Sequence, residues 1–395
     1  MIKVPMFRPL IEQPEIDAAV EALRMGWLGM GSYVNEMEQA LTAHLDLGDK
    51  RLALVNTGHS ALHLALEVAN VGPGDEVITP SFNCVSDFQA ILQTGAEPVL
   101  CDVRDDTLTI DVASAEPLVS ERTKAVIFID YAASLADYDA VEAFAAKHGL
   151  RVIHDAAHSF NSRDSRGRMV GSFSDLTMLS FDPVKTLTCL DAGAIIVNND
   201  EELARVHEMR ILGMGQPPSV MYQNKRAWTF HVNDHGYRYH VLNLHAAIGL
   251  QQLAKIERIA ETRRDTCAYY LDRLAGIDDL VLPQIDLENA TPFIFVVRVP
   301  GERRDDFRTK LGENGIDTGV HWQPGHHFEV LTECRRGNLR VSMQAGDEIV
   351  SLPLHSAMEE AAMEAVADTV TAYFKGTLSR DGGGDTALEQ IAAAG

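Results

Sequence analysis

The sequence predicts an α/β protein whose larger domain is a doubly wound, mostly parallel sheet. Short apolar runs of strand length alternate with amphipathic helical stretches between residues 51 and 198, which is typical of such a sheet. Beyond residue 250, a long helical stretch is followed by a few mixed strands and helices, as in a small α+β domain. The length of 395 residues leaves room for both. We therefore expect a large domain over 1–250, a small C-terminal domain over 251–375, and a disordered Gly-rich tail over 376–395.

The individual elements follow from periodicity. The first helix is expected over 14–25, with Ile16, Ala19, Val20 and Leu23 on one face, and a second over 32–44. A Gly-rich loop around Trp27 joins them. The predicted strands are 51–55, 76–80, 98–103, 125–129, 152–155, 177–181, 194–198 and 292–299. The later predicted helices are 139–148, 242–274, 305–315 and 359–374.

Composition excludes several classes of function. A net charge of −23 argues against nucleic acid or an anionic membrane as a partner. No run of about 18 apolar residues predicts a membrane span, and the first residues lack a signal peptide's apolar stretch. The five cysteines are scattered and form no CxxC pair, so we expect a reducing, cytoplasmic location and no structural zinc.

A single lysine stands between two of the predicted buried strands. The run Leu179–Phe181 leads through Asp182 and Pro183 to Lys185, and the next strand follows at 194–198. Lysine is seldom buried unless it is paired or used in chemistry. A confined amine loses its proton more easily and can then attack a carbonyl group. A surface lysine on a loop is the alternative if this stretch is taken alone.

An acid stands thirty residues before this lysine, at the end of the predicted strand 152–155. Ligands of open α/β sheets bind beyond the carboxyl ends of the strands. Pyridoxal phosphate (PLP) requires a lysine for its aldehyde and a carboxylate to keep its pyridine nitrogen protonated. We therefore expect Lys185 and Asp155 to serve this cofactor as the catalytic pair.

A strand, a Gly-containing turn and a helix follow one another around residues 51–69. Such a junction presents free backbone N–H groups and the positive end of a helix dipole. The turn Asn56-Thr57-Gly58-His59-Ser60 is therefore a predicted phosphate site, with Gly58, His59 and Ser60 as its members.

Several segments together resemble the DegT/StrS family of sugar aminotransferases. They are "GWLGMGSYVNEMEQAL", "NTGHSALHLAL", "GDEVITPSF", "VIHDAAHSF", "GSFSDLTMLSFDPVKTLTCLDAGAIIV" and "GYRYHVLNLHAAIGLQQLAKI". They keep the family's order and spacing from about Pro5 to Phe374. The resemblance implies a fold-type I PLP transferase, a homodimer with shared active sites, and amino transfer from an amino acid, commonly glutamate, to a keto sugar that is often nucleotide-linked.

The resemblance also implies roles for further residues. His158 would touch the cofactor's ring oxygen and Ser180 its phosphate. Cys84 stands where the family usually has an aromatic residue stacked on the ring, so either Phe82 moves in or the ring packs on a smaller surface. Arg238 stands where the family commonly has Asn, which reaches the phosphate of the neighbouring subunit's cofactor.

Substrate contacts are implied for Trp27 in its Gly-rich loop and for His321 and His326 in the loop "HWQPGHHFE". The histidines of this loop also suggest a metal site. We expect none, because the loop has no rigid helical spacing of ligands.

Three alternatives stay open at this point. The acceptor can be a keto cyclitol or another non-sugar ketone, since Cys84 and Arg238 depart from the family pattern. A PLP-dependent sugar dehydratase is a second alternative, although family members of that kind replace the lysine with His. A non-catalytic relative that binds a partner is the third, and the intact pair of Lys185 and Asp155 argues against it.

Overall fold

The computed structural model describes residues 3–215 and 218–378. Within them the chain is an α/β protein with one large, mostly parallel sheet flanked by helices, as predicted. All but the first three residues of the predicted tail 376–395 lie outside the described residues.

The large sheet is built from seven strands, and a further pair belongs to the C-terminal part. The strands are β1 Arg51–Val55, β2 Glu76–Pro80, β3 Glu97–Cys101, β4 Thr123–Ile129, β5 Arg151–Asp155, β6 Leu176–Ser180, β7 Gly193–Val197, β8 Phe295–Arg298 and β9 Ile349–Leu352. The helices are α1 Gln13–Met25, α2 Ser32–His44, α3 Gly58–Val68, α4 Val85–Gln93, α5 Val112–Ala115, α6 Tyr138–His148, α7 Asp200–Met209, α8 Pro218–Met221, α9 Asn243–Ala254, α10 Ile256–Arg273, α11 Gly301–Glu313, α12 Arg340–Glu348 and α13 Glu360–Phe374.

The strand order of the large sheet is β1-β7-β6-β5-β4-β2-β3. β7 pairs antiparallel with both β1 and β6, and the other pairings are parallel. β7 is thus antiparallel to the other six strands of this sheet. The carboxyl ends of β1, β5 and β6 therefore meet at the same edge, where the amino end of β7 also lies.

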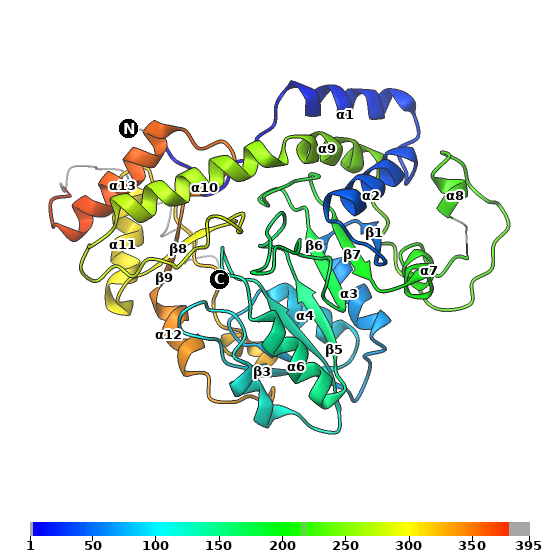
Figure 1. Cartoon of the computed structure of the whole chain (residues 1–395), viewed down its shortest axis with the longest axis horizontal. Helices are drawn as coiled ribbons and strands as arrows, with labels where there is room; N and C mark the ends of the chain where they lie inside the picture. The colour runs from blue at the N-terminus through cyan, green and yellow to red at the C-terminus, as the bar shows by residue number, and fades with distance from the viewer. Residues whose placement is uncertain (1–2, 216–217, 379–395) are drawn as a thin grey trace.

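Helices cover both faces of this sheet (Figure 1). On one face, α2 contributes Met37 and Leu41 to a buried cluster with Ile196 of β7. On the other face, α3 contributes Leu62 and Leu66 to a second cluster with the neighbouring residue Ile195. Successive side chains of a strand point to opposite faces, so the continuous apolar strands predicted from the sequence are buried on both sides.

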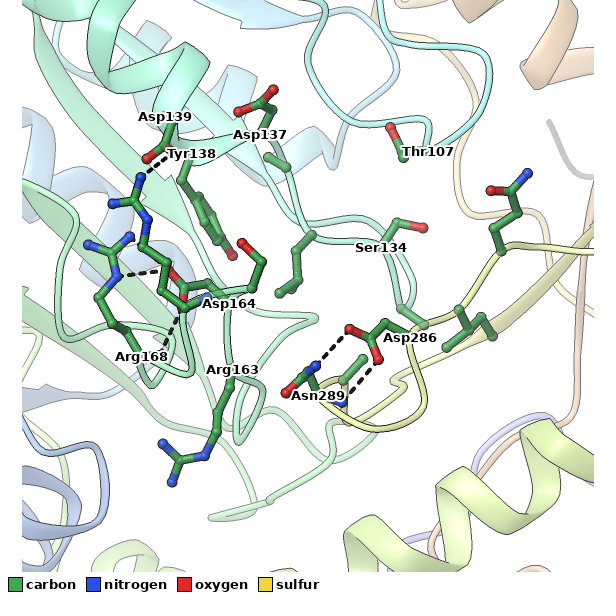
Figure 2. A pocket seen from close by; sticks show the side chains of 18 residues that line it. Thr107, Ser134, Asp137, Tyr138, Asp139, Arg163, Asp164, Arg168, Asp286 and Asn289 are labelled. Carbon is green, nitrogen blue, oxygen red and sulfur yellow. Dashed lines mark hydrogen bonds and ion pairs between the residues drawn. The ribbon is translucent and has the colours of Figure 1, made fainter.

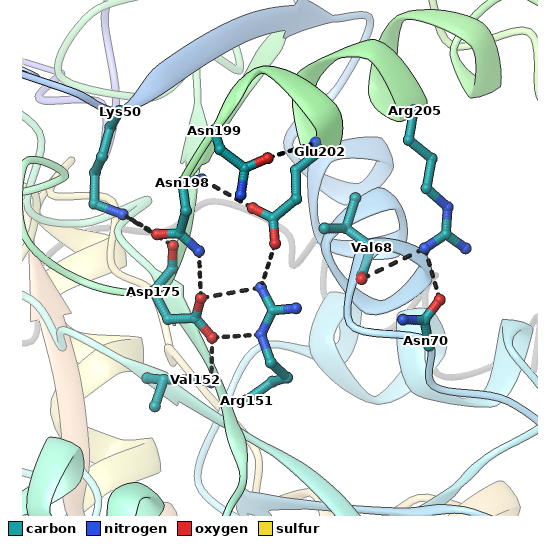
Figure 3. A network of polar contacts seen from close by, with 10 residues as sticks. All are labelled: Lys50, Val68, Asn70, Arg151, Val152, Asp175, Asn198, Asn199, Glu202 and Arg205. Carbon is teal, nitrogen blue, oxygen red and sulfur yellow. Dashed lines mark hydrogen bonds and ion pairs between the residues drawn. The ribbon is translucent and has the colours of Figure 1, made fainter.

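A polar network links strand ends at the edge of the sheet opposite the carboxyl ends of β1, β5 and β6 (Figure 3). Arg151, at the start of β5, donates two hydrogen bonds to Asp175, at 2.7 and 3.0 Å, and one to Glu202 of α7 at 2.9 Å. Asn198, just after β7, donates to Asp175 at 2.6 Å and accepts a hydrogen bond from Lys50 at 2.7 Å. This network ties the ends of β5, β6 and β7 together, so the strands that carry Asp155 and Ser180 have a fixed register.

A second, smaller core surrounds the pair β8 and β9 (Figure 1). It is formed by Phe295, Val350 and the apolar faces of α10, α11 and α13, and Val4 from the N-terminal segment joins it. The predicted boundary at residue 250 falls inside α9, and the division into domains stays a prediction.

The single helix predicted over 242–274 is wrong: α9 ends at Ala254 and α10 begins at Ile256. At the junction Lys255 has φ −116° and ψ 18°, and its ammonium group donates to Leu10 O at 2.8 Å and to Glu12 at 3.0 Å. The helix is interrupted where it meets the segment that leads into α1.

The apolar face of α1 is largely exposed. Its predicted members Ile16 and Leu23 are 50% and 54% exposed, because α1 packs on α9 through its other side (Figure 1). In the described ranges, no helix combines the length and apolar character that crossing a membrane requires.

Candidate active site

A cavity of about 520 Å³ opens at the edge where β1, β5 and β6 end. Its volume is within the usual range for small-molecule sites. The cavity brings together eight of the residues predicted from the sequence, which belong to segments far apart in the chain. They are Gly58, His59, Cys84, Asp155, His158, Ser180, Lys185 and His321.

One end of the cavity is the N-terminus of α3. Thr57 caps this helix, and its Oγ1 accepts a hydrogen bond from the N–H of Ser60 at 3.0 Å. The first N–H groups of a helix have no partner within the helix, and the dipole makes this end positive. The Ser180 side chain, from the end of β6, lies against Gly58. Free backbone N–H groups, a positive helix end and a hydroxyl group are the donors that a phosphate group requires, as predicted for this turn.

The close packing at this end depends on two glycines. A Cβ on Gly58 would lie 2.8 Å from Ser180 Cβ, and one on Gly193 would lie 2.4 Å from Thr57 O. Both distances are shorter than real Cβ contacts, so β6 and β7 approach the start of α3 only because these positions carry no side chain.

Asp155 and Lys185 also line the cavity. The Asp155 carboxylate accepts a hydrogen bond from the N–H of Ala157 at 2.8 Å. Burial raises the pKa of Asp155, and it lowers the pKa of the Lys185 amine. An amine with a lowered pKa is more often neutral near pH 7 and is therefore a better nucleophile and base.

Aromatic side chains form the wall beside Lys185. Its Nζ lies 4.2 Å from the ring centroid of Phe293. His158 is stacked on Trp322, with centroids 4.9 Å apart, and lies 4.4 Å from the centroid of Phe293. Nδ1 of His158 accepts a hydrogen bond from the N–H of Ala132 at 3.3 Å, and burial lowers the pKa of this imidazole well below its usual value. His158 is therefore neutral, with its proton on Nε2.

Cys84 and His59 lie on the side of the cavity formed by α3 and α4. Phe82 does not replace the missing aromatic of position 84, because it is fully buried and packs edge-on against Tyr131 at 5.1 Å. Cys84 itself lines the cavity. His59 makes hydrogen bonds with Ser86 at 2.9 Å and Gln93 at 3.1 Å, which hold its ring against α4.

Four predicted site residues do not line this cavity in the described chain. Ser60 is buried and donates to Asn56 at 2.7 Å. His326 forms a hydrogen bond with Ser81 at 2.8 Å. Trp27 and Arg238 line a different cavity of about 290 Å³, together with residues of the segment 211–230.

Sequence reasoning missed several residues of the site. Phe293 falls within the predicted strand 292–299 and Trp322 within the loop that also holds His321 and His326, but neither was predicted as a site residue, and their place in the cavity follows only from the fold. Asp87 is fully buried beside Asp155, and its only sequence signal was its position in the first turn of α4, three residues after Cys84.

A larger cavity, of about 710 Å³, lies elsewhere, between α6, the segment 163–168 and the segment 284–290 (Figure 2). Among the described residues that line it there is no lysine and no predicted site residue. Its charged side chains largely pair with one another: Arg168 binds Asp164 at 2.7 Å, and Arg166 binds Asp139. Within the described part of the chain, no group of His, Cys, Asp and Glu is arranged to hold a metal ion.

Comparisons with known proteins agree with this fold. A model of the DegT/DnrJ/EryC1/StrS aminotransferase family matches residues 9–371. The spore coat polysaccharide biosynthesis protein SpsC of Bacillus subtilis (strain 168) is 32% identical over 383 residues, which are 94% of this chain and 97% of that protein.

Solved structures of other proteins have the same fold as this chain. The aminotransferase TlmJ from Streptoalloteichus hindustanus superimposes with a TM-score of 0.86 at 28% identity, over 95% of this chain and 100% of TlmJ. Spr1654 from Streptococcus pneumoniae, in its PLP form, superimposes with a TM-score of 0.87 at 24% identity, over 96% and 100% of the two chains, and supports the fold alone. The chain therefore belongs to the DegT/DnrJ/EryC1/StrS aminotransferase family and is a PLP-dependent aminotransferase.

Proposed function

We propose that this enzyme moves an amino group from an amino acid, glutamate in the first instance, to a nucleotide-linked keto sugar. The observation that carries the proposal is that Lys185, Asp155 and the N-terminus of α3 line the same cavity. This arrangement supplies an amine, an acid and a phosphate site within one volume, as PLP requires.

The residues present fit this cofactor. The start of α3 and the Ser180 hydroxyl would hold its phosphate, Asp155 would pair with its pyridine nitrogen, and Lys185 would hold its aldehyde. His158, neutral with a proton on Nε2, would donate to the ring oxygen. Cys84 would pack against one face of the ring. When bound, PLP supplies the electron sink that stabilises negative charge at the amino acid's α-carbon.

The overall reaction exchanges an amino group and a carbonyl oxygen: the amino acid becomes a keto acid, and the keto sugar becomes an amino sugar. Lys185 Nζ acts as the base that removes the proton from the donor's α-carbon and later returns a proton to the carbon that is aminated. Its lowered pKa suits both directions. Proton transfer by a positioned base is typically worth about 10²–10⁴-fold in rate.

Two observations support a sugar as the acceptor. The relative SpsC is named for spore coat polysaccharide biosynthesis, a pathway that builds sugars, which is consistent with a sugar as the acceptor here. The cavity wall offers the aromatic Trp322 and the imidazole of His321, whose pKa is lowered to about 4 by burial, so it is a neutral partner for sugar hydroxyl groups. We propose that His321 contacts the substrate inside the cavity, and that His326 and Trp27, which do not line it, contact parts of the substrate that extend beyond it.

A keto cyclitol is the second candidate acceptor. The observation that favours it is Cys84, which replaces a larger aromatic side chain and changes the space beside the cofactor ring. The dehydratase alternative loses support, because Lys185 is present and lines the cavity.

We further propose a homodimer with shared sites. The exposed apolar residues Ile16 and Leu23 of α1 would be buried by a second copy, since contiguous apolar surface usually marks an interface. Arg238 lies outside the cavity of its own chain, as expected if it reaches the partner's cofactor phosphate. All five cysteines are free, which is consistent with the cytoplasmic location that we propose.

The acceptor is tested with the enzyme converted by glutamate to its amino-carrying form. This form is mixed with a panel of nucleotide keto sugars and keto cyclitols, and products are identified by mass spectrometry. We expect an amino sugar from a nucleotide-linked substrate. A product from the cyclitols alone would replace our acceptor with the second candidate, and no product with Lys185→Ala would assign turnover to Lys185.

A further inference from the structure

A second buried carboxyl group, that of Asp87, interacts with Asp155. Asp87, in the first turn of α4, has an exposed fraction of 0%. Its Oδ2 accepts a hydrogen bond from Asn83 Nδ2 at 2.6 Å, and the same Asn83 group donates to Thr79 Oγ1 at 3.1 Å. Asp87 Oδ1 is buried and has no partner of good geometry among the described residues. One oxygen of this side chain is therefore held, and the other is available.

The side chain of Asp87 interacts with the carboxyl group of Asp155. The other titratable groups that act on Asp87 are Lys185, which lines the cavity, and Cys84 at the start of α4. Asp155 is better stabilised as an anion than Asp87, because it accepts the N–H of Ala157 and lies near the Lys185 amine. The Asp87 carboxyl accepts a hydrogen bond from the amide of Asn83, and the Lys185 amine also lowers its pKa, but neither offsets burial and the charge of Asp155.

Two carboxylates cannot both stay ionised in one buried place, because burial and their mutual repulsion disfavour the second charge. Burial, followed by the charge of Asp155, raises the pKa of Asp87 well above its usual value. Burial also raises the pKa of Asp155, but Ala157 and Lys185 oppose the shift. The proton that the pair retains therefore belongs on Asp87.

We propose that Asp87 is a neutral carboxylic acid whose Oδ1–H donates a hydrogen bond to Asp155, and that it is a positioning residue for the carboxylate facing the cofactor nitrogen. This role of Asp87 rests on the proposed function of Asp155. The hydrogen bond fixes the orientation of the Asp155 carboxylate and leaves the pair with a single negative charge. That charge is the one needed to keep a pyridine nitrogen protonated.

Two substitutions of Asp87 test whether its role is to donate a hydrogen bond to Asp155. Asp87→Asn keeps the shape, can donate an N–H to Asp155, and can still accept from Asn83. Asp87→Ala removes the donor and leaves Asp155 with only its backbone partner. We expect Asp87→Ala to weaken PLP binding by about tenfold, as for a lost hydrogen bond to a charged group, and Asp87→Asn to bind within about twofold of the parent.

The proton itself is observable by infrared spectroscopy of the full chain, with and without PLP. At neutral pH we expect the C=O stretching band of a protonated carboxylic acid, and we expect Asp87→Asn to remove it. Asp130→Asn is the control. Asp130 is also buried, but its contact with His154 at 2.7 Å helps to hold its pKa low, so its substitution should leave the band in place.

The outcomes are distinct. Absence of the band in the parent protein, or its persistence in Asp87→Asn, overturns the neutral acid. Equal loss of PLP affinity in Asp87→Asn and Asp87→Ala overturns the positioning role. If Asp87→Ala does not fold, the infrared comparison still tests whether Asp87 is a neutral acid, and a loss of PLP affinity well beyond twofold in Asp87→Asn would overturn the positioning role. Failure of the parent protein to bind PLP would refute the proposed function instead, and the band without cofactor would still test the protonation of Asp87.

Discussion

Substituting Gly58 by Ala should damage the phosphate end of the site with the smallest possible change. The new Cβ would lie 2.8 Å from Ser180 Cβ, 3.0 Å from Ser180 Oγ and 3.3 Å from Ser180 Cα. Restoring the first contact to an ordinary 3.4 Å requires a shift of 3.4 − 2.8 = 0.6 Å between α3 and the end of β6. Such a shift would lengthen a hydrogen bond of about 2.9 Å to about 3.5 Å, at the limit of useful geometry.

The expected loss follows from this displacement. One hydrogen bond to a charged phosphate is worth about 1.5–3 kcal/mol, so the Kd for PLP should rise by roughly 10- to 100-fold. The overpacking itself should also lower protein stability, by about 1–3 kcal/mol. Fluorescence or absorbance titration of the apo form measures the first quantity, and thermal unfolding without cofactor measures the second.

Gly312→Ala is the matched control. Gly312 lies in helix α11, and a Cβ there would meet nothing within 4 Å. The same substitution should therefore leave PLP binding unchanged and raise stability by up to about 1 kcal/mol through helix propensity. If Gly58→Ala binds PLP as tightly as Gly312→Ala does, the start of α3 and Ser180 do not form the phosphate site.

Three further predictions follow from the site and its surroundings. Asp155→Asn should lose most of its kcat, since it keeps the shape but not the charge that protonates the cofactor nitrogen; near-normal steady-state rates would remove that role from Asp155. Mixed Lys185→Ala and Arg238→Ala chains should regain activity at low PLP, up to about one working site per heterodimer, whereas no gain after verified subunit exchange would mean that Arg238 does not serve its partner. His355, whose pKa burial and two nearby arginines lower to about 4, binds a proton more readily when unfolded. Its contribution to stability is present above about pH 6.5 and is lost as the pH falls to about 4. Between these pH values, the thermal unfolding midpoint of His355→Asn should therefore fall less steeply than that of the parent protein.

The large sheet could be predicted because its strands are short, apolar and regularly separated. Each strand of the β1 to β7 series has a matching run in the sequence, since burial on both faces leaves a continuous apolar signal. The interruption at Lys255 could not be predicted, because lysine favours helices. It depends on contacts of Lys255 with Leu10 and Glu12, more than 240 residues away in the chain.

The site was predictable where a residue type is rare in its setting. A lysine between buried strands and an acid at a strand end are such cases, and the structure places Lys185 and Asp155 in one cavity. Asp87 had no such signal, because an acid in the first turn of a helix is ordinarily a favourable neighbour of the helix dipole. Its burial against Asp155 comes from the packing of α4 beside the sheet.

Reduction with borohydride tests the central claim most directly. The enzyme is loaded with PLP, reduced, digested and mapped by mass spectrometry. We predict that the cofactor is attached to Lys185, and that Lys185→Ala carries no attached cofactor after the same treatment. Attachment to a different lysine, with Lys185 unmodified, would contradict the proposed active site.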